Sequence, residues 1–88
     1  MPELSRFFGI IIRMMFNEFG QHKMPHIHVV YGDHEAVIGF DGEIIDGYIP
    51  AKQKRLVSAW VAIHEEELND AWSKAVKNFS FDKIAPLQ

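Results

Sequence analysis

The chain has 88 residues, a formal net charge of -3 at pH 7, 48% hydrophobic residues and no cysteine. This length predicts one domain over residues 1–88, and high hydrophobicity with modest charge excludes an intrinsically disordered chain. The lack of cysteine excludes disulfides, thiolate metal sites and cysteine nucleophiles. The acidic balance also argues against a surface built mainly to bind phosphate.

The sequence predicts no targeting or membrane-spanning segment. Residues 1–6 lack a basic region followed by a long apolar stretch, so we expect no signal peptide. The apolar run Gly9–Ile12 is far shorter than the roughly 18 residues that a membrane span needs. We therefore expect a cytoplasmic protein without a membrane partner.

The N-terminal part predicts an antiparallel β-meander of four strands over residues 5–49. Residues 6–16 are rich in β-branched and aromatic side chains on both faces, which predicts one central strand. The elements expected after it are a loop at 17–24 and strands at 26–31, 35–40 and 43–49.

After Pro50 the apolar residues change to helical spacing. They recur at i, i+3 and i+4 through residues 56–76, which predicts an amphipathic helix on one face of the sheet. Three acids at 65–67 suit the first turn of a second helix, because the helix dipole favours negative charge there. The expected fold is therefore α+β, a four-stranded meander covered on one side by a helix or a helix pair. The helical part would span 50–79, before a tail at 80–88.

Two-residue turns at 32–33 and 41–42 predict which side chains share a face of the meander. With these turns, the core face carries Ile27, Val29, Tyr31, Ala36, Ile38, Phe40, Ile45 and Ile49. His26 and His28 then lie on the opposite face, beside Gly39, whose missing side chain would leave room for a ligand.

Three of the five histidines lie within seven residues, at His22, His26 and His28. Alternation along a strand places His26 and His28 on one face, about 6–7 Å apart, where two imidazoles can bind one metal ion or one anion. With His22 or a carboxylate as a third ligand, the cofactor would be a divalent metal such as zinc. A plain polar face and a metal-free acid/base pair are the alternatives that this pattern leaves open.

His64 falls on the apolar stripe of the predicted helix and so points toward the core face. It can join His26 and His28 only if the register slips by one residue, because such a slip reverses the faces of a strand. Otherwise it is a buried, hydrogen-bonded histidine of the helix. A separate basic group occupies the first helical turn, at Lys52, Lys54 and Arg55. Cations oppose the helix dipole there, which indicates either an anion contact or a solvated cluster.

Three blocks follow one another along the chain, at Ser5–Ile10, His22–Gly32 and Trp60–Trp72. In order and spacing they resemble the bacterial family called domain of unknown function 4160, over about residues 3–78. The signature positions are His22, Pro25, His26, His28, Tyr31, Gly32, Trp60, His64, Glu67, Leu68 and Trp72. The chain has Met24-Pro25 where many members have Pro-Pro. Because His64 belongs to the same signature as His26 and His28, the resemblance favours a shared site.

The resemblance implies a small bacterial protein that is often encoded beside another small domain of unknown function. Such pairs have been proposed as toxin–antitoxin modules, with this domain as the toxin. We therefore expect a toxin-like component acting on RNA or another anionic target. Its acid/base groups would be His26, His28 and His64, with the basic group holding phosphate. The alternatives are an interaction module that binds the neighbouring protein or a second copy without catalysis, and a metal-binding regulatory module.

Overall fold

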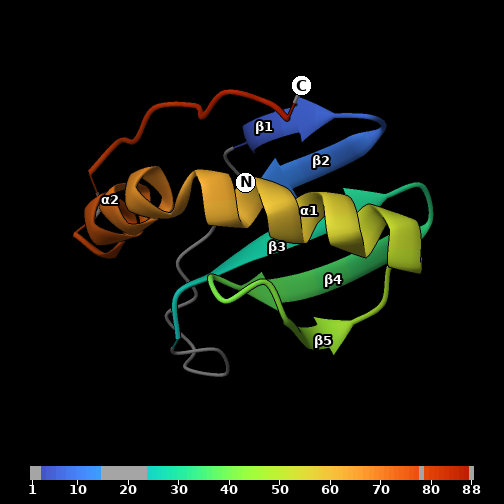
Figure 1. Ribbon diagram of the computed structural model, residues 1–88. Helices are drawn as coiled ribbons and strands as arrows, with labels where there is room; N and C mark the ends of the chain where they lie inside the picture. Colours follow the sequence, from blue (N-terminus) through green and yellow to red (C-terminus); the bar gives the residue numbers. More distant parts are fainter. Residues whose placement is uncertain (1–2, 15–23, 78, 88) are drawn as a thin grey trace.

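The computed structural model describes residues 3–14, 24–77 and 79–87, which form an antiparallel sheet followed by two helices (Figure 1). The elements are β1 (Glu3–Phe7), β2 (Ile10–Arg13), β3 (His26–Tyr31), β4 (His34–Gly39), β5 (Ile44–Gly47), α1 (Ala51–Ile63) and α2 (Glu65–Val76). The strands lie in the order β1-β2-β3-β4-β5, so each pairs with its neighbour in sequence. The α+β class and the antiparallel meander are confirmed, whereas the expected count of four strands is wrong.

The fifth strand arises because a turn divides the apolar run that was expected to form one strand. Phe8 and Gly9 form this turn with φ values of 50° and 77°, and Phe7 pairs with Ile10 across it. Two positive φ values are typical of a two-residue hairpin turn, which usually takes Asn-Gly. Because Phe8 takes the place of Asn at the first turn position, the sequence does not predict this turn. Residues 15 and 16 of the expected strand lie outside the described residues.

The predicted pairing of β3 with β4 is confirmed. Tyr31 lies opposite His34 across the two-residue turn, and Gly32 takes the positive φ of 58° that the first turn position requires. Because side chains alternate along a strand, His26 and His28 lie on the face opposite the core, as expected.

The turn after β4 differs from the prediction. The Gly42 N–H donates to the Gly39 carbonyl at 2.9 Å, and Gly42 has a φ of 85°. This loop contains one residue more than a two-residue turn, and Ile38 therefore pairs with Ile44 rather than with Ile45. As a result Ile44 packs against the core, while Ile45, expected on the core face, is exposed.

α1 covers one side of the sheet, whereas α2 reaches His26 of the other face through Trp72. α1 crosses the sheet, and α2 continues beyond its edge after a break at His64 (Figure 1). The sequence left open whether this region forms one helix or two, and the structure has two. Three glutamates occupy the first turn of α2, where the helix dipole favours negative charge. The buried core combines residues from the sheet, from both helices and from the tail: Leu4, Phe7, Ile10, Ile12, Met14, Ile27, Val29, Ala36, Ile38, Ile49, Val57, Trp60, Val61, Leu68, Ala71, Ala75 and Ile84.

The C-terminal tail returns from α2 to β1 (Figure 1). The Ile84 N–H donates to the Leu4 carbonyl at 2.9 Å, and the Trp60 Nε1–H donates to the Ala85 carbonyl at 2.8 Å. Trp60 itself is fully buried under α1. The tail is therefore fastened both to the edge strand β1 and to the centre of the core.

We expect Gly47→Ala to destabilise the protein far more than Gly32→Ala. Both glycines have positive φ, which costs roughly 1–2 kcal/mol for an L-residue. At Gly47 an added Cβ would also collide with the Glu35 carbonyl oxygen, whereas at Gly32 it would meet nothing within 4 Å. Urea unfolding of both variants checks this, and equal losses of stability would contradict the close approach of β5 to β4.

Candidate functional site on the outer face of the sheet

The outer face is the face of the sheet that points away from α1. One row of opposed residues crosses all five strands on it, which we call the polar row. Glu3 lies opposite Arg13, and Arg13 lies opposite His28. His28 lies opposite Val37, and Val37 lies opposite Asp46. Directly opposed residues point to the same face. An arginine and a histidine therefore lie next to each other in the middle, with a carboxylate at each end.

Arginines keep the β1 end of the polar row ionised. Arg6 donates a hydrogen bond to Glu3 at 2.8 Å, and this bond holds the pKa of the Glu3 carboxyl below its usual value. The charges of Arg6, Lys83 and Arg13 lower this pKa further. The same pair raises the pKa of Arg6. Arg13 thus lies between an ionised carboxylate and His28.

A hollow of about 200 Å³ lies beside His28 on the outer face. Its walls include His28, Glu35, Val37 and Asp46, together with the backbone of Gly47. The Gly47 N–H donates to the Asp46 carboxylate at 2.8 Å, which orients this carboxylate. The Nε2 atom of His28 is buried. The hollow thus combines an imidazole with two carboxylates, and Arg13 lies outside it, opposite His28.

His26 is buried and does not line the hollow. Its side chain is fully buried, with ring centroids 5.0 Å from Trp72 and 5.4 Å from His28. Its Nδ1 lies 2.6 Å from the Met24 carbonyl oxygen. Because a carbonyl only accepts hydrogen bonds, Nδ1 carries a proton. His26 therefore supports the position of His28 from the start of β3 and is not itself exposed to a ligand.

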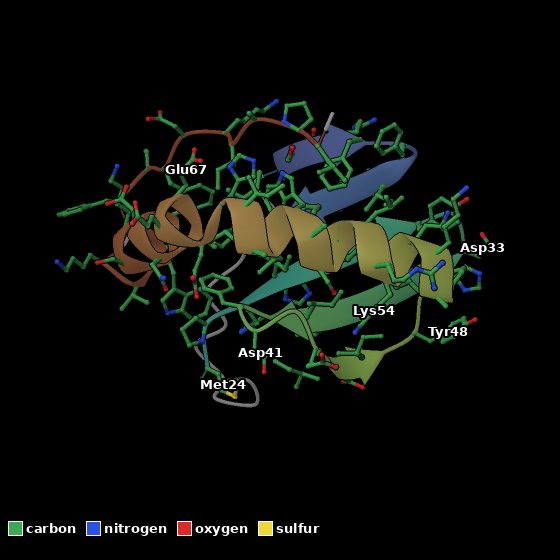
Figure 2. The ribbon with its side chains drawn as sticks, in the orientation of Figure 1. Met24, Asp33, Asp41, Tyr48, Lys54 and Glu67 are labelled. Atoms are coloured by element: carbon green, nitrogen blue, oxygen red, sulfur yellow. The ribbon has the colours of Figure 1, made fainter. Side chains whose placement is uncertain are left out.

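The space beside Gly39 is filled. An added Cβ would meet Asp41 Oδ1 at 3.0 Å, Ile45 Cδ1 at 3.5 Å and Met24 Cε at 3.7 Å. The expected room for a ligand at this glycine is therefore wrong, because the side chains around the β4–β5 loop close over it. Figure 2 shows Met24 and Asp41 on this side of the molecule.

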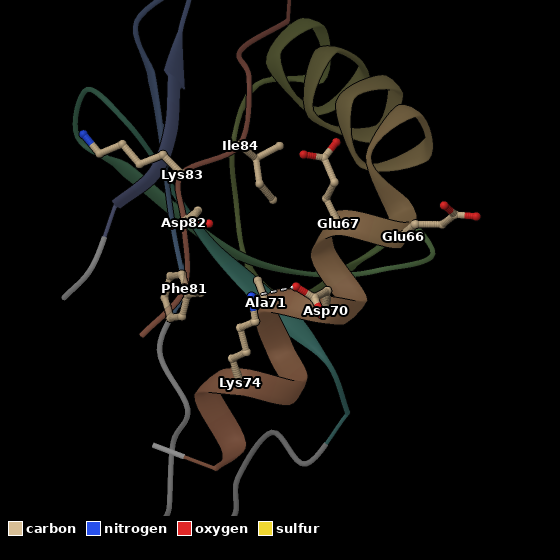
Figure 3. Close-up of a pocket in the computed structure, with 9 residues that line it drawn as sticks. All are labelled: Glu66, Glu67, Asp70, Ala71, Lys74, Phe81, Asp82, Lys83 and Ile84. Atoms are coloured by element: carbon tan, nitrogen blue, oxygen red, sulfur yellow. Dashed lines mark ion pairs between the residues drawn. The ribbon is translucent and has the colours of Figure 1, made fainter. Parts of the chain in front are cut away.

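His64 lies at the junction of the two helices. Its Nδ1 donates to Glu67 Oε1 at 2.6 Å, and its ring lies 5.4 Å from that of Trp60. Glu67 also lines a hollow of about 290 Å³ between α2 and the tail, in which Lys74 pairs with Asp70 (Figure 3). The contacts of His64 are thus with an aromatic ring of the core and with an acidic helix turn.

Within residues 3–14, 24–77 and 79–87, no three His, Asp or Glu side chains are grouped so that they could hold a metal ion. His26 and His28 come together, and His64 does not complete such a group with them. His22 lies outside the described residues, so a zinc site of His22, His26 and His28 stays a prediction.

The basic group at the start of α1 is divided. Lys54 pairs with Glu43 at 3.4 Å. Lys52 instead lines a different hollow at the end of the sheet. The first turn of α1 carries no acid, and its N-cap is Pro50, which makes no side-chain capping bond.

Sequence reasoning found His28 but missed Arg13, Glu35 and Asp46. The predicted pairing of β3 with β4 could have placed Glu35 on the face of His28, because it lies two positions before Val37. Arg13 could not be placed, because the connection from β2 to β3 is too long to fix the register of the two strands. The predicted turn at 41–42 places Asp46 opposite Val37, as observed, although the sequence analysis did not name Asp46 as a site residue.

The family model of the Domain of unknown function DUF4160 matches residues 9–73, which carry His26, His28 and His64. The chain belongs to this family. Searches of curated proteins and of solved structures gave no match. In the part of the chain that the structure describes, no helix of this DUF4160 protein is long and apolar enough to cross a membrane.

We expect the two neighbouring histidines to differ in what their loss does to stability. His26→Ala removes a fully buried ring and should cost roughly 2–4 kcal/mol, as other large core truncations do. His28→Ala removes a half-buried ring beside a hollow and should cost less than about 1 kcal/mol. Chemical denaturation measures both. Equal losses of stability in the two variants would contradict the conclusion that His26 is buried and His28 lines the hollow.

Proposed function

We propose that this DUF4160 protein is a toxin-like component of a two-protein module and acts on RNA in the cytoplasm. The observation that carries the proposal is the hollow lined by His28, Glu35 and Asp46, with Arg13 opposite His28 on the other side. Imidazole takes and gives protons near neutral pH, and guanidinium is suited to phosphate. The acid/base site would therefore be His28 with Asp46, rather than the three histidines His26, His28 and His64.

The reaction would be transfer of a phosphodiester to its own 2′-hydroxyl. The His28 imidazole takes the 2′-hydroxyl proton, and the oxygen attacks phosphorus to form a 2′,3′-cyclic phosphate. The P–O5′ bond breaks, and the 5′-oxygen takes a proton from water. Arg13 balances the negative charge that gathers on the phosphoryl oxygens. Asp46 stabilises the imidazolium that forms, and the Gly47 N–H holds this carboxylate in place.

We expect the protein to cleave single-stranded RNA in the presence of a chelator and to leave the matching DNA intact. His28→Ala should lower the rate about 100-fold or more, as loss of an acid/base group does. Asp46→Asn should lower it less, and His64→Ala, at the helix junction, is the matched control that should keep it. The assay follows cleavage of a labelled oligonucleotide over pH 5–8.

Two results would refute the acid/base proposal. One is the absence of RNA cleavage by the wild type in the presence of chelator, of zinc and of nickel. The other is an unchanged rate in His28→Ala, provided that its circular dichroism spectrum matches the wild type. Cleavage that requires zinc and is lost in His26→Ala/His28→Ala would instead favour the metal alternative.

A second candidate function is partner binding through β5. This strand forms one edge of the sheet, and Ile45 and Tyr48 beside it are exposed large hydrophobic residues. The opposite edge, β1, is bonded to the tail through Ile84. An edge strand with exposed apolar side chains is a template for a strand of another chain. We propose that the neighbouring protein of the module adds a strand here, with a second copy of this chain as the alternative.

We expect Ile45→Lys/Tyr48→Lys to weaken the complex with the co-expressed neighbouring protein at least about tenfold, because charges at an edge strand oppose strand addition. Ile63→Lys is the matched control, since Ile63 on α1 is 66% exposed and Tyr48 is 61% exposed. Calorimetry measures the affinity and light scattering the oligomeric state. Equal weakening by both variants, or no complex and a monomeric wild type, would contradict this candidate.

A further inference from the structure

A third hollow, of about 370 Å³, lies at the end of the sheet where α1 begins. It is lined by Phe8, Tyr31, Lys52, Gln53 and Leu56. These residues come from the β1–β2 turn, from the end of β3 and from the first two turns of α1. The volume is within the range of small-molecule sites, and mixed aromatic and polar walls are typical of them. We call this hollow the aromatic pocket.

Phe8 has a backbone conformation that is unfavourable for a bulky side chain. Its φ is 50°, a left-handed conformation that bulky residues rarely adopt, and its side chain is 61% exposed. Asn at this turn position would relieve the strain and remove an exposed apolar ring. Strained residues of this kind cluster at ligand sites. Phe8 does contact Phe7 edge to face, with ring centroids 6.2 Å apart, but most of the residue stays exposed. The strained φ together with this exposure indicates a use for the ring at the surface.

Tyr31 forms the second aromatic wall and is held by the turn itself. A Cβ at Gly9 would lie 3.4 Å from Tyr31 Cε1, so the ring packs directly on the glycine backbone. Tyr31 shares the helix side of the sheet with Val29, whereas His28 lies on the outer face. The aromatic pocket and the His28 hollow are therefore on different sides of the sheet.

The polar wall of the pocket comes from α1. Lys52 supplies a cation and Gln53 an amide that can donate and accept hydrogen bonds. The first turn contains no acid that would neutralise Lys52 from its own helix. The nearby charges are Arg55 on α1, Lys54 with its partner Glu43, and Asp33 in the β3–β4 turn at the same end (Figure 2).

We infer that the aromatic pocket binds a nucleoside phosphate, with the base against Phe8 and Tyr31 and the phosphate at Lys52. Every base has a flat π face, so stacking on aromatic side chains accepts any of them. A planar group attached to an anion is the ligand that two rings and a lysine fit together. The inference is independent of the His28 hollow and of RNA cleavage. The ligand is either a free nucleotide or one unit of single-stranded RNA.

The test follows amide resonances in ¹⁵N-labelled full-length protein during titration with AMP, adenosine, inorganic phosphate and a six-residue oligoadenylate. We expect AMP to shift the amides of Phe8, Tyr31 and Lys52, and to bind more tightly than adenosine or phosphate alone. Added salt should weaken AMP binding because of the lysine contact. Tighter binding of the oligoadenylate than of AMP identifies single-stranded RNA as the source, and equal affinities identify the free nucleotide.

Phe8→Asn separates binding from folding. It should raise the melting temperature, because Asn-Gly is the preferred sequence for this turn. It should weaken AMP binding about tenfold or more, as loss of one stacking side chain does. Lys52→Gln should also weaken binding and reduce its salt dependence, whereas Lys77→Gln, directly after α2, is the matched control.

Two results would overturn the inference. They are the absence of any AMP or oligoadenylate shift at Phe8, Tyr31 and Lys52, and unchanged AMP affinity in Phe8→Asn. His28→Ala should keep AMP binding. Failure of RNA cleavage and failure of this inference can therefore be told apart.

Discussion

The burial of Trp60 beneath α1 is the interaction on which the rest of the structure depends. Its ring is fully buried, lies 5.7 Å from Phe7 of β1, and donates a hydrogen bond to the tail at Ala85. A chain of this length has a thin core, so one large side chain that contacts the sheet, the helix and the tail contributes much of the packing. His64, one turn later, packs on the same ring at the helix junction.

Because α1 packs on one side, the meander divides its side chains into two sets with different tasks. The helix side takes the aliphatic residues, and the outer face takes the polar row. Alternation made this division predictable for β3 and β4, where a two-residue turn at 32–33 places His28 opposite Val37. It was predictable for only part of β5. Val37 pairs with Asp46 as the expected turn requires, but one extra loop residue brings Ile44 rather than Ile45 opposite Ile38.

The candidate site was predictable only in its local part. Two histidines at i and i+2 share a face in any strand, so the pair itself follows from the sequence. Burial separates them, however, because Trp72 of α2 packs on His26 and leaves His28 as the one that lines a hollow. That contact joins residues far apart in the chain. The carboxylate of Asp46 likewise reaches the site only through strand pairing.

The turn at Phe8 explains both the error in strand count and the position of the aromatic pocket. A sequence that served folding alone would place Asn there, and the turn would then be visible as Asn-Gly. Phe8 instead accepts a strained φ and exposure to solvent, while Gly9 lets Tyr31 pack against the same turn. Local rules fail where a residue is kept for a reason other than stability. Phe8, which made the sequence predict one strand instead of two, is therefore also the residue that most directly indicates a ligand site.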